Sequence, residues 1–279
     1  MGPRIILAVL GIQGLLSGCI SQNPGSTSIR TGLEEALVFQ PQVYPQGCWA
    51  KPPGVQDVWF QSPDALALHG WFAAAKQPRA VVLFMHGNGG NLTDCREVLQ
   101  AFRDGLNASV LIFDYRGYGR SEGKPSEEGV LADARAARHW LAAHAGVAEG
   151  DIVLVGHSLG GGVAVDLAAR DGARGLVLEN TFTSLPGVAW SHFPLLPFGL
   201  VMHCRLNSLD KIASYHGPLL VKHGDADEIV PFALGKKLFA AANEPKQFIT
   251  IPGGKHNDLP SREYLTALDQ FLGSLPARH

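Results

Sequence analysis

Residues 152–162 constrain the fold of this chain more than any other stretch. Residues 152–155, Ile-Val-Leu-Val, predict a short buried strand, and residues 163–170 predict a helix. Between them, residues 156–160 (Gly-His-Ser-Leu-Gly) must turn the chain sharply. A strand, a tight turn and a helix form the context that a G-x-S-x-G nucleophile turn requires. Its glycines carry no Cβ, so strand and helix can approach closely, and we expect a strained Ser158 with an exposed hydroxyl.

A second copy of the same pattern occupies residues 119–123, Gly-Arg-Ser-Glu-Gly. The letters alone therefore do not identify a nucleophile. Arg-Gly-Tyr-Gly separates this copy from the preceding predicted strand, and Lys124 and Pro125 follow where a helix would be needed. We interpret Ser121 as a loop residue and Ser158 as the nucleophile.

Apolar runs alternate with helical patterns through most of the chain. Predicted strands cover residues 55–60, 66–73, 80–85, 109–113, 152–155, 176–178, 219–222 and 247–251. Predicted helices cover residues 92–104, 163–170, 232–242 and 262–272, with a further helix capped by Ser126. This alternation predicts the α/β class with a doubly wound, mostly parallel sheet. Ligands bind at the carboxyl ends of the strands in such sheets, and the candidate catalytic residues all follow strands.

The N-terminus has the pattern of a targeting signal. Arg4 precedes an apolar run at residues 5–16 that is too short to span a bilayer as a stable helix. Residues 16–19, Leu-Ser-Gly-Cys, resemble the bacterial lipobox. This resemblance implies that residues 1–18 are a lipoprotein signal peptide and that Cys19 carries lipid. The alternative is an ordinary signal peptide with an incidental cysteine.

The expected location is the bacterial cell envelope. Ile20 rather than Asp follows Cys19, which by resemblance favours the outer membrane with the protein facing the periplasm. Residues 19–32 then read as a flexible tether, rich in Ser, Gly, Asn, Pro and Thr, and residues 33–279 as the folded domain. The net charge of −2 gives no indication of a nucleic-acid partner.

Three cysteines remain in the mature chain, namely Cys48, Cys95 and Cys204. In an oxidising compartment one pair could be bridged, and three buried free thiols are the alternative. No histidine–carboxylate cluster has metal-ligand spacing, so neither a metal nor another cofactor is expected.

Residues 180–209 break the alternation of strands and helices. Their apolar residues stand among prolines and glycines, and they are Phe182, Trp190, Phe193, Leu195, Leu196 and Phe198. We favour a small cap whose apolar side chains line the substrate pocket, because the segment follows the strand next to the nucleophile. An irregular connection that merely covers the sheet is the alternative.

A serine hydroxyl needs a base to take its proton, and the base needs an orienting acid. In parallel α/β sheets that carry a G-x-S-x-G nucleophile turn, the order along the chain is serine, acid, histidine, with the histidine in the loop after the last strand. His256 lies directly after the strand at residues 247–251, whereas His279 is the terminal residue. His256 is therefore the candidate base.

The acid is expected after the strand at residues 219–222, where Asp225, Asp227 and Glu228 compete. We choose Asp227, because Asp225 could brace the turn as an Asx residue. Glu179, at the end of the preceding strand, is a weaker alternative.

Acyl transfer also needs donors for the developing oxyanion. The backbone N–H of Leu159, just after the nucleophile, is one candidate. The Gly-rich loop at residues 86–91 supplies the other, with Asn88 favoured and Gly89 the near alternative. This loop lacks the spacing of a P-loop or a dinucleotide site, which argues against phosphate binding.

From about Leu33 to the C-terminus, the chain resembles the α/β-hydrolases, most closely the abhydrolase-domain branch that includes eukaryotic depalmitoylating members. Five segments carry the resemblance in this order: His-Gly-Asn-Gly-Gly-Asn (86–91), Asp-Tyr-Arg-Gly-Tyr-Gly-Arg-Ser (114–121), Gly-His-Ser-Leu-Gly (156–160), Gly-x-x-Asp-x-x-Val-Pro (224–231) and Gly-x-His-Asn (254–257). The resemblance implies the α/β-hydrolase fold, a triad of Ser158, Asp227 and His256, and oxyanion donors at Asn88 and Leu159.

The expected function is therefore a serine hydrolase of the carboxylesterase or thioesterase type, acting on a small-molecule acyl ester or thioester. A non-catalytic envelope lipoprotein built on the same fold is one alternative, since fold does not fix function. A serine peptidase is another, although the chain has no room for a large cap or propeller. The oligomeric state does not follow from the sequence.

Overall fold

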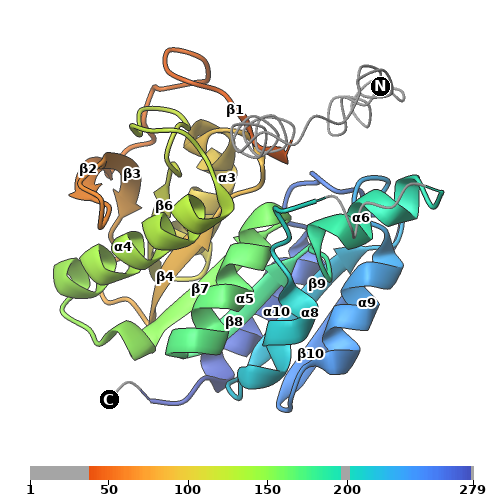
Figure 1. Cartoon of the computed structure of the whole chain (residues 1–279). Coiled ribbons are helices and arrows are strands. Elements are labelled where there is room, and N and C mark those ends of the chain that lie inside the picture. Colours follow the sequence, from red (N-terminus) through yellow and green to blue (C-terminus); the bar gives the residue numbers. More distant parts are fainter. Residues whose placement is uncertain (1–37, 196–201, 278–279) are drawn as a thin grey trace, which may run out of the picture.

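The computed structural model describes residues 38–195 and 202–277. Within these residues, eight strands form a central sheet in the order β10-β9-β8-β7-β4-β6-β3-β2 (Figure 1). The strands are β2 (Val55–Gln61), β3 (Ala67–Ala73), β4 (Ala80–Met85), β6 (Ala108–Phe113), β7 (Ile152–His157), β8 (Gly175–Glu179), β9 (Leu219–Gly224) and β10 (Lys246–Ile251). Strands β10 to β6 pair in parallel, and β3 is antiparallel to both β6 and β2. The predicted fold class, a mostly parallel α/β sheet, is confirmed.

Burial explains why the central strands are continuous apolar runs. Every residue of β4, β6, β8 and β9 is buried, because helices cover both faces of the sheet. Strand β2, at the edge of the sheet, instead alternates between buried and exposed positions over its second half. The two patterns are the reason that the strands could be located from hydrophobicity alone.

Helices pack against both faces of the sheet. One face carries α4 (Glu127–Ala145), α5 (Leu159–Asp171), α8 (Ser208–Lys211) and α9 (Phe232–Ala241), and the other carries α3 (Arg96–Gln100) and α10 (Arg262–Ser274) (Figure 1). The remaining elements are β1 (Gln40–Pro41), which pairs with β5 (Gly89–Gly90), the short helices η2 (Leu92–Cys95), η3 (Ala101–Gly105), η4 (Glu149–Asp151) and η5 (Ile212–Ser214), and α6 (Leu185–His192). A three-layer arrangement places the carboxyl ends of β4, β7, β8 and β9 at one common edge.

Helix α4 begins and ends where its sequence signals indicate. The Ser126 hydroxyl accepts a hydrogen bond from the Gly129 N–H at 3.1 Å, and Glu127 and Glu128 stand in the first turn. Carboxylates there interact favourably with the helix dipole. The helix ends at Gly146, whose φ of +66° is left-handed and suits glycine.

The helix predicted for residues 92–104 is instead three short pieces, η2, α3 and η3. Its first turn is tied to other groups. The Asn91 side chain accepts from Thr93 N–H at 3.0 Å, and Leu92 N–H donates to the Asp114 carboxylate at 2.8 Å. These bonds hold the first turn as a 3₁₀ helix and fix the loop before it, which forms part of the pocket described below.

Several expectations concern residues outside the described ranges. These are the signal peptide at 1–18, the lipid on Cys19 and the tether at 19–32, together with Leu196, Phe198 and His279. In the ranges that the structure does describe, no helix has both the length and the apolar character needed to cross a bilayer.

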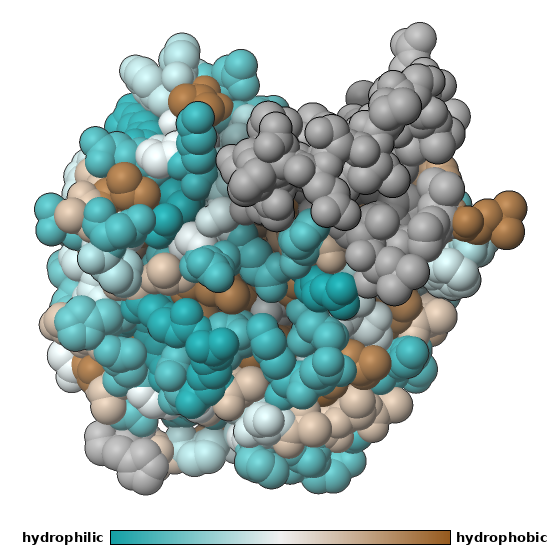
Figure 2. Space-filling model, viewed as in Figure 1, coloured by the Kyte–Doolittle hydropathy of each residue, from teal (hydrophilic) through white to brown (hydrophobic). Residues whose placement is uncertain are grey.

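Cys48, Cys95 and Cys204, the three cysteines of the described chain, form no disulfide. Cys48 is exposed, Cys95 is partly buried and Cys204 is buried. The sequence left two alternatives, namely one bridged pair or three buried free thiols. Neither is met as stated, because no pair is bridged and only Cys204 of the three is classed as buried. On the surface seen in Figure 2, apolar side chains are mostly separated by polar ones, as is usual for a folded domain.

Candidate active site

Ser158 lies at the sharp turn between β7 and α5, as the sequence predicts. Its φ of +52° and ψ of −116° are strained for a residue with a Cβ. A Cβ on Gly156 would collide with the carbonyl of Gly160, and one on Gly160 would collide with the carbonyl of Met85. Only glycine lets the helix approach the strands this closely.

The Ser158 hydroxyl is not exposed on the outer surface, contrary to the expectation. The residue is 8% exposed, because the loops that follow β4, β9 and β10 surround the turn. Ser158 instead lines a pocket of about 510 Å³, a size typical of small-molecule sites. The strained turn therefore presents its hydroxyl to this pocket.

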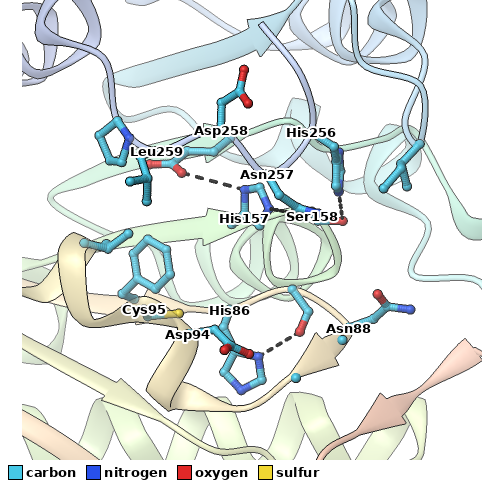
Figure 3. Close-up of a pocket in the computed structure, with 18 of the residues that line it drawn as sticks. His86, Asn88, Asp94, Cys95, His157, Ser158, His256, Asn257, Asp258 and Leu259 are labelled. Carbon is cyan, nitrogen blue, oxygen red and sulfur yellow. Dashed lines mark hydrogen bonds and ion pairs between the residues drawn. The ribbon is translucent and has the colours of Figure 1, made fainter. Parts of the chain in front are cut away.

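A continuous chain of hydrogen bonds joins three of the predicted residues. His256 Nε2 lies 2.9 Å from Ser158 Oγ, and His256 Nδ1 lies 2.7 Å from Asp227 Oδ2 (Figure 3 shows the first contact). All three residues are buried. They come from three separate loops at the carboxyl edge of the sheet, 98 and 29 residues apart along the chain.

The Asp227 carboxylate is the best satisfied acid in this region. Its Oδ1 accepts from the Ile229 and Val230 N–H groups, each at 2.9 Å. Burial alone would raise its pKa. Hydrogen bonds from His223 and His256 outweigh burial and hold the pKa of Asp227 well below its usual range. Asp227 is thus a carboxylate throughout the physiological pH range.

The rival acids lie elsewhere. Asp225 is exposed and accepts from the Gly253 N–H at 2.6 Å, so it braces the loops after β9 and β10. Glu228 is exposed. Glu179 is buried at the end of β8, where it accepts from the Tyr264 hydroxyl at 2.5 Å. Among these four carboxylates, it is Asp227 that contacts His256.

The Gly-rich loop after β4 runs beside the nucleophile. A Cβ built on Gly87 would lie 3.6 Å from the Ser158 Cβ, and Asn88 and Gly89 line the same pocket. The Asn88 side chain donates to the Val38 carbonyl at 2.8 Å, and the Asn88 carbonyl accepts from Tyr118 at 2.8 Å. These bonds fix the loop. Leu159 is the first residue of α5, a position whose N–H has no partner within the helix.

The predicted cap contributes little to this pocket. Its described part contains α6 and the segments on either side, with Phe182 buried in the core, Trp190 exposed and Leu195 94% exposed. None of these three residues lines the pocket, whose apolar lining includes Phe84, Val98, Leu259 and Pro260. These three residues therefore contribute nothing to this lining. Leu185 and Val188 of α6 pack instead against the core on the sheet face that carries α4 and α5. Residues 196–201 of the predicted cap lie outside the described ranges.

Two residues that the sequence did not single out connect the loops of the site. The Asn180 amide donates to the His256 carbonyl at 2.5 Å, and its Oδ1 accepts from the Gly224 N–H at 3.3 Å. His223 is fully buried and lies 3.3 Å from Asp227 Oδ2. The two Asn180 contacts span 44 and 76 residues, so no local pattern reveals them, whereas His223 and Asp227 are only four residues apart. The only signal in the sequence was that Asn180 and His223 are polar residues at the ends of buried strands.

His157 lies beside the nucleophile and is partly buried, with 20% of its side chain exposed. Its Nε2 is 3.4 Å from the Asn257 Oδ1, as Figure 3 shows, and its ring centroid is 5.1 Å from that of His256. Burial, followed by the nearby His256 and Lys222, lowers the pKa of His157 to about 3. His157 is therefore neutral at pH 7, and no second positive charge competes with a protonated His256.

The Ser121 hydroxyl bonds the backbone of two other residues, in agreement with its interpretation as a loop residue. Its hydroxyl donates to the Asp114 carbonyl at 2.7 Å and accepts from the His69 N–H at 2.9 Å. The neighbouring Arg116 forms ion pairs with the buried Asp133 and with Asp64. The second G-x-S-x-G copy thus belongs to a loop that is held together by buried polar contacts.

We expect Ser121→Ala to lower stability without affecting the site. Loss of the hydroxyl leaves the buried His69 N–H and Asp114 carbonyl unpaired, which costs about 1–3 kcal/mol of unfolding free energy. Urea denaturation measures the change, and Ser191→Ala, at an exposed serine with one hydrogen bond, is the matched control. Loss of reactivity towards a serine-directed probe in Ser121→Ala, with the fold intact, would contradict this interpretation.

In the described part of the chain, no group of three or more histidine, cysteine, aspartate or glutamate side chains is arranged to hold a metal ion. Cys95 lines the pocket, but burial raises the pKa of its thiol well above the usual range, so it is not a reactive thiolate. Ser158, His256 and Asp227 form the hydrogen-bonded series of this pocket.

Comparison with known sequences places the chain among relatives of one fold. A sequence model described as "alpha/beta hydrolase fold" matches residues 80–201. An uncharacterized protein of Mycobacterium tuberculosis is 42% identical over 79% of this chain and 80% of its own length. The α/β hydrolase domain-containing protein WAV2 of Arabidopsis thaliana is 34% identical over 73% of this chain and 72% of its own length.

Solved structures share the architecture at lower sequence identity. The Pyrococcus furiosus esterase Pf2001 superimposes with a TM-score of 0.69 at 20% identity, covering 85% of this chain and 99% of that one. The esterase domain of a Rhodothermus marinus protein gives a TM-score of 0.60 at 23% identity, covering 79% and 96%. At this level of identity the likeness concerns the fold.

Proposed function

Because the chain belongs to the α/β hydrolase family, we propose that it is a serine hydrolase that cleaves carboxylic ester or thioester bonds through an acyl-enzyme intermediate. The observation that carries this proposal is the hydrogen-bonded chain from Ser158 Oγ through His256 to Asp227. A strained, pocket-facing serine next to a buried imidazole and a buried carboxylate is an arrangement suited to nucleophilic catalysis.

The first half of the reaction forms the acyl-enzyme. His256 Nε2 takes the proton of Ser158 as Oγ attacks the carbonyl carbon, and Asp227 stabilises the imidazolium that results. The backbone N–H groups of Leu159 and Asn88 donate to the developing oxyanion. The imidazolium then gives its proton to the departing alcohol or thiol, which leaves the acyl group on Ser158.

The second half releases the acid. His256 takes a proton from water as the water oxygen attacks the acyl carbon, and the returned proton restores the Ser158 hydroxyl. The apolar lining formed by Phe84, Val98, Leu259 and Pro260 supports an acyl ester or thioester as the substrate. Because His157 is neutral, no second positive charge stands beside the imidazolium that forms on His256, and Asp227 stabilises that imidazolium.

A fluorophosphonate probe tests the proposal on the wild-type protein. The expected result is covalent labelling at one site, mapped by mass spectrometry to the peptide that contains Ser158, together with hydrolysis of 4-nitrophenyl esters. A wild-type protein that is folded but neither labels nor hydrolyses any ester of a chain-length series would favour a non-catalytic lipoprotein on the same fold.

We further propose that the protein is anchored in the bacterial envelope by lipid on Cys19. The expected consequence of Cys19→Ser is loss of labelling by an alkyne fatty acid and release of the protein from the membrane fraction, because stable anchoring depends on the acyl chains. Cys48→Ser, at an exposed cysteine of the folded domain, is the control. Fatty-acid labelling of Cys19→Ser at the wild-type level would disprove this anchor.

A further inference from the structure

Three pocket residues stand side by side at the carboxyl ends of neighbouring strands. His157 on β7 is in register with Glu179 on β8, and Glu179 is in register with Lys222 on β9. In-register residues of adjacent strands project to the same face of a sheet, here the face covered by α10. All three line the pocket that contains Ser158. With strands about 4.8 Å apart, the Lys222 Cα lies about 10 Å from that of His157.

The acidic groups of this pocket already have partners. Glu179 accepts from the Tyr264 hydroxyl at 2.5 Å, and its other oxygen is 3.8 Å from His157 Nδ1. Asp258 accepts from the Lys255 N–H at 2.7 Å, and Asp94 accepts from the Asn91 N–H at 3.3 Å. Figure 3 shows Asp94 and Asp258 on opposite sides of the pocket. None of these carboxylates lies within 4.0 Å of the Lys222 amine.

Lys222 differs from these groups. The residue is only 5% exposed, yet among residues 38–195 and 202–277 its ammonium has neither a hydrogen bond nor an ion pair. Its Nζ lies over the face of the Tyr264 ring, 5.6 Å from the ring centroid. An ammonium has three donors. The Lys222 Nζ is not fully shielded from solvent, so these donors are open to the pocket. A ligand that enters the pocket could supply the missing acceptor.

We propose that Lys222 forms a subsite for a carboxylate carried by the substrate, several bonds away from the carbonyl that Ser158 attacks. The inference rests on the proposed function and adds a substrate class to it, namely esters or thioesters with an anionic end. A single ammonium with three donors suits a monoanion. A phosphate dianion would call for further donors, such as the fork of an arginine. Tyr264 holds Glu179 at a fixed place and leaves the Lys222 donors free.

The test compares charged and neutral esters in two series. In the first, the carboxylate is on the acyl side, with mono-4-nitrophenyl glutarate against 4-nitrophenyl pentanoate. In the second it is on the leaving group, with the butyrate esters of 3-hydroxyphenylacetate and 3-methylphenol. The quantity measured is kcat/KM for the charged ester divided by kcat/KM for its neutral partner, each corrected for spontaneous hydrolysis.

Lys222→Met is expected to lower this ratio about 10- to 100-fold in the series that places its carboxylate at Lys222, as loss of a charge-assisted hydrogen bond does. Lys236→Met is the matched control, because Lys236 also lies over an aromatic ring, 4.5 Å from the centroid of Phe248, but does not line the pocket. The ratio in this control stays at the wild-type value.

The failures of the two proposals are distinguishable. A wild-type protein that hydrolyses no ester overturns the proposed function. A protein that hydrolyses the neutral esters but whose ratio is unchanged by Lys222→Met in both series overturns the subsite alone. If Lys222→Met does not fold, the wild-type ratios decide, since a preference of more than about tenfold for the neutral ester in both series excludes a carboxylate subsite.

Discussion

Ser158→Ala is expected to lower kcat for ester hydrolysis about 10⁶-fold, the scale seen when the nucleophile of a Ser-His-Asp triad is removed. Alanine leaves His256 and Asp227 in place but removes the oxygen that would attack the substrate carbonyl. The variant should also fail to react with a fluorophosphonate. Steady-state rates with 4-nitrophenyl esters, at enzyme concentrations high enough to detect residual turnover, provide the measurement.

The second serine motif provides the control for this experiment. Ser121→Ala removes the same hydroxyl from the same sequence pattern, but in a loop where it bonds the Asp114 carbonyl and the His69 N–H. Labelling should persist in Ser121→Ala and disappear in Ser158→Ala. Near-normal hydrolysis by Ser158→Ala would exclude Ser158 as the nucleophile.

Asp227→Asn is expected to lower kcat about 10⁴-fold, as the same change does in serine proteases. The amide cannot carry the negative charge that stabilises a protonated His256, and it can favour the wrong tautomer of the imidazole. The strongly lowered pKa of Asp227 means that the wild-type carboxylate is ionised at any pH where the enzyme would be assayed.

Asp225→Asn removes the same charge two residues away and separates the two candidates. Asp225 is exposed and bonds the Gly253 N–H, so its loss should change kcat by less than about threefold and act on loop stability instead. Comparable losses in both variants would show that kcat responds to the charge of the loop. A larger loss in Asp225→Asn would mean that Asp227 is not the orienting acid.

Local patterns were sufficient for most of the fold. Strands buried on both faces must be continuously apolar, so β4, β6, β8 and β9 were located within one or two residues at each end. The cap of α4 at Ser126 and the turn at Ser158 depend on neighbours within four residues. The helix expected at residues 92–104 was wrong in detail, because Asp114, the residue that follows the next strand, binds its first turn.

The choice among acids illustrates what a pattern leaves open. Asp225, Asp227 and Glu228 lie within four residues of one another and all follow β9. Which of them meets His256 depends on how the loops after β9 and β10 fold together. Asn180 contributes to that arrangement, because it bonds the backbone of both loops from a third strand.

By itself, the sequence determined the order of strands and helices, the strained turn at Ser158 and the candidate residues at the strand ends, because each depends on short-range backbone geometry and burial. Only the tertiary structure decided that Asp227 rather than Asp225 contacts His256 and that the described cap residues Phe182, Trp190 and Leu195 lie away from the pocket. It also placed His157, Glu179 and Lys222 in one row. Those relations join residues tens of positions apart, and pairing between strands, not local preference, sets their distances.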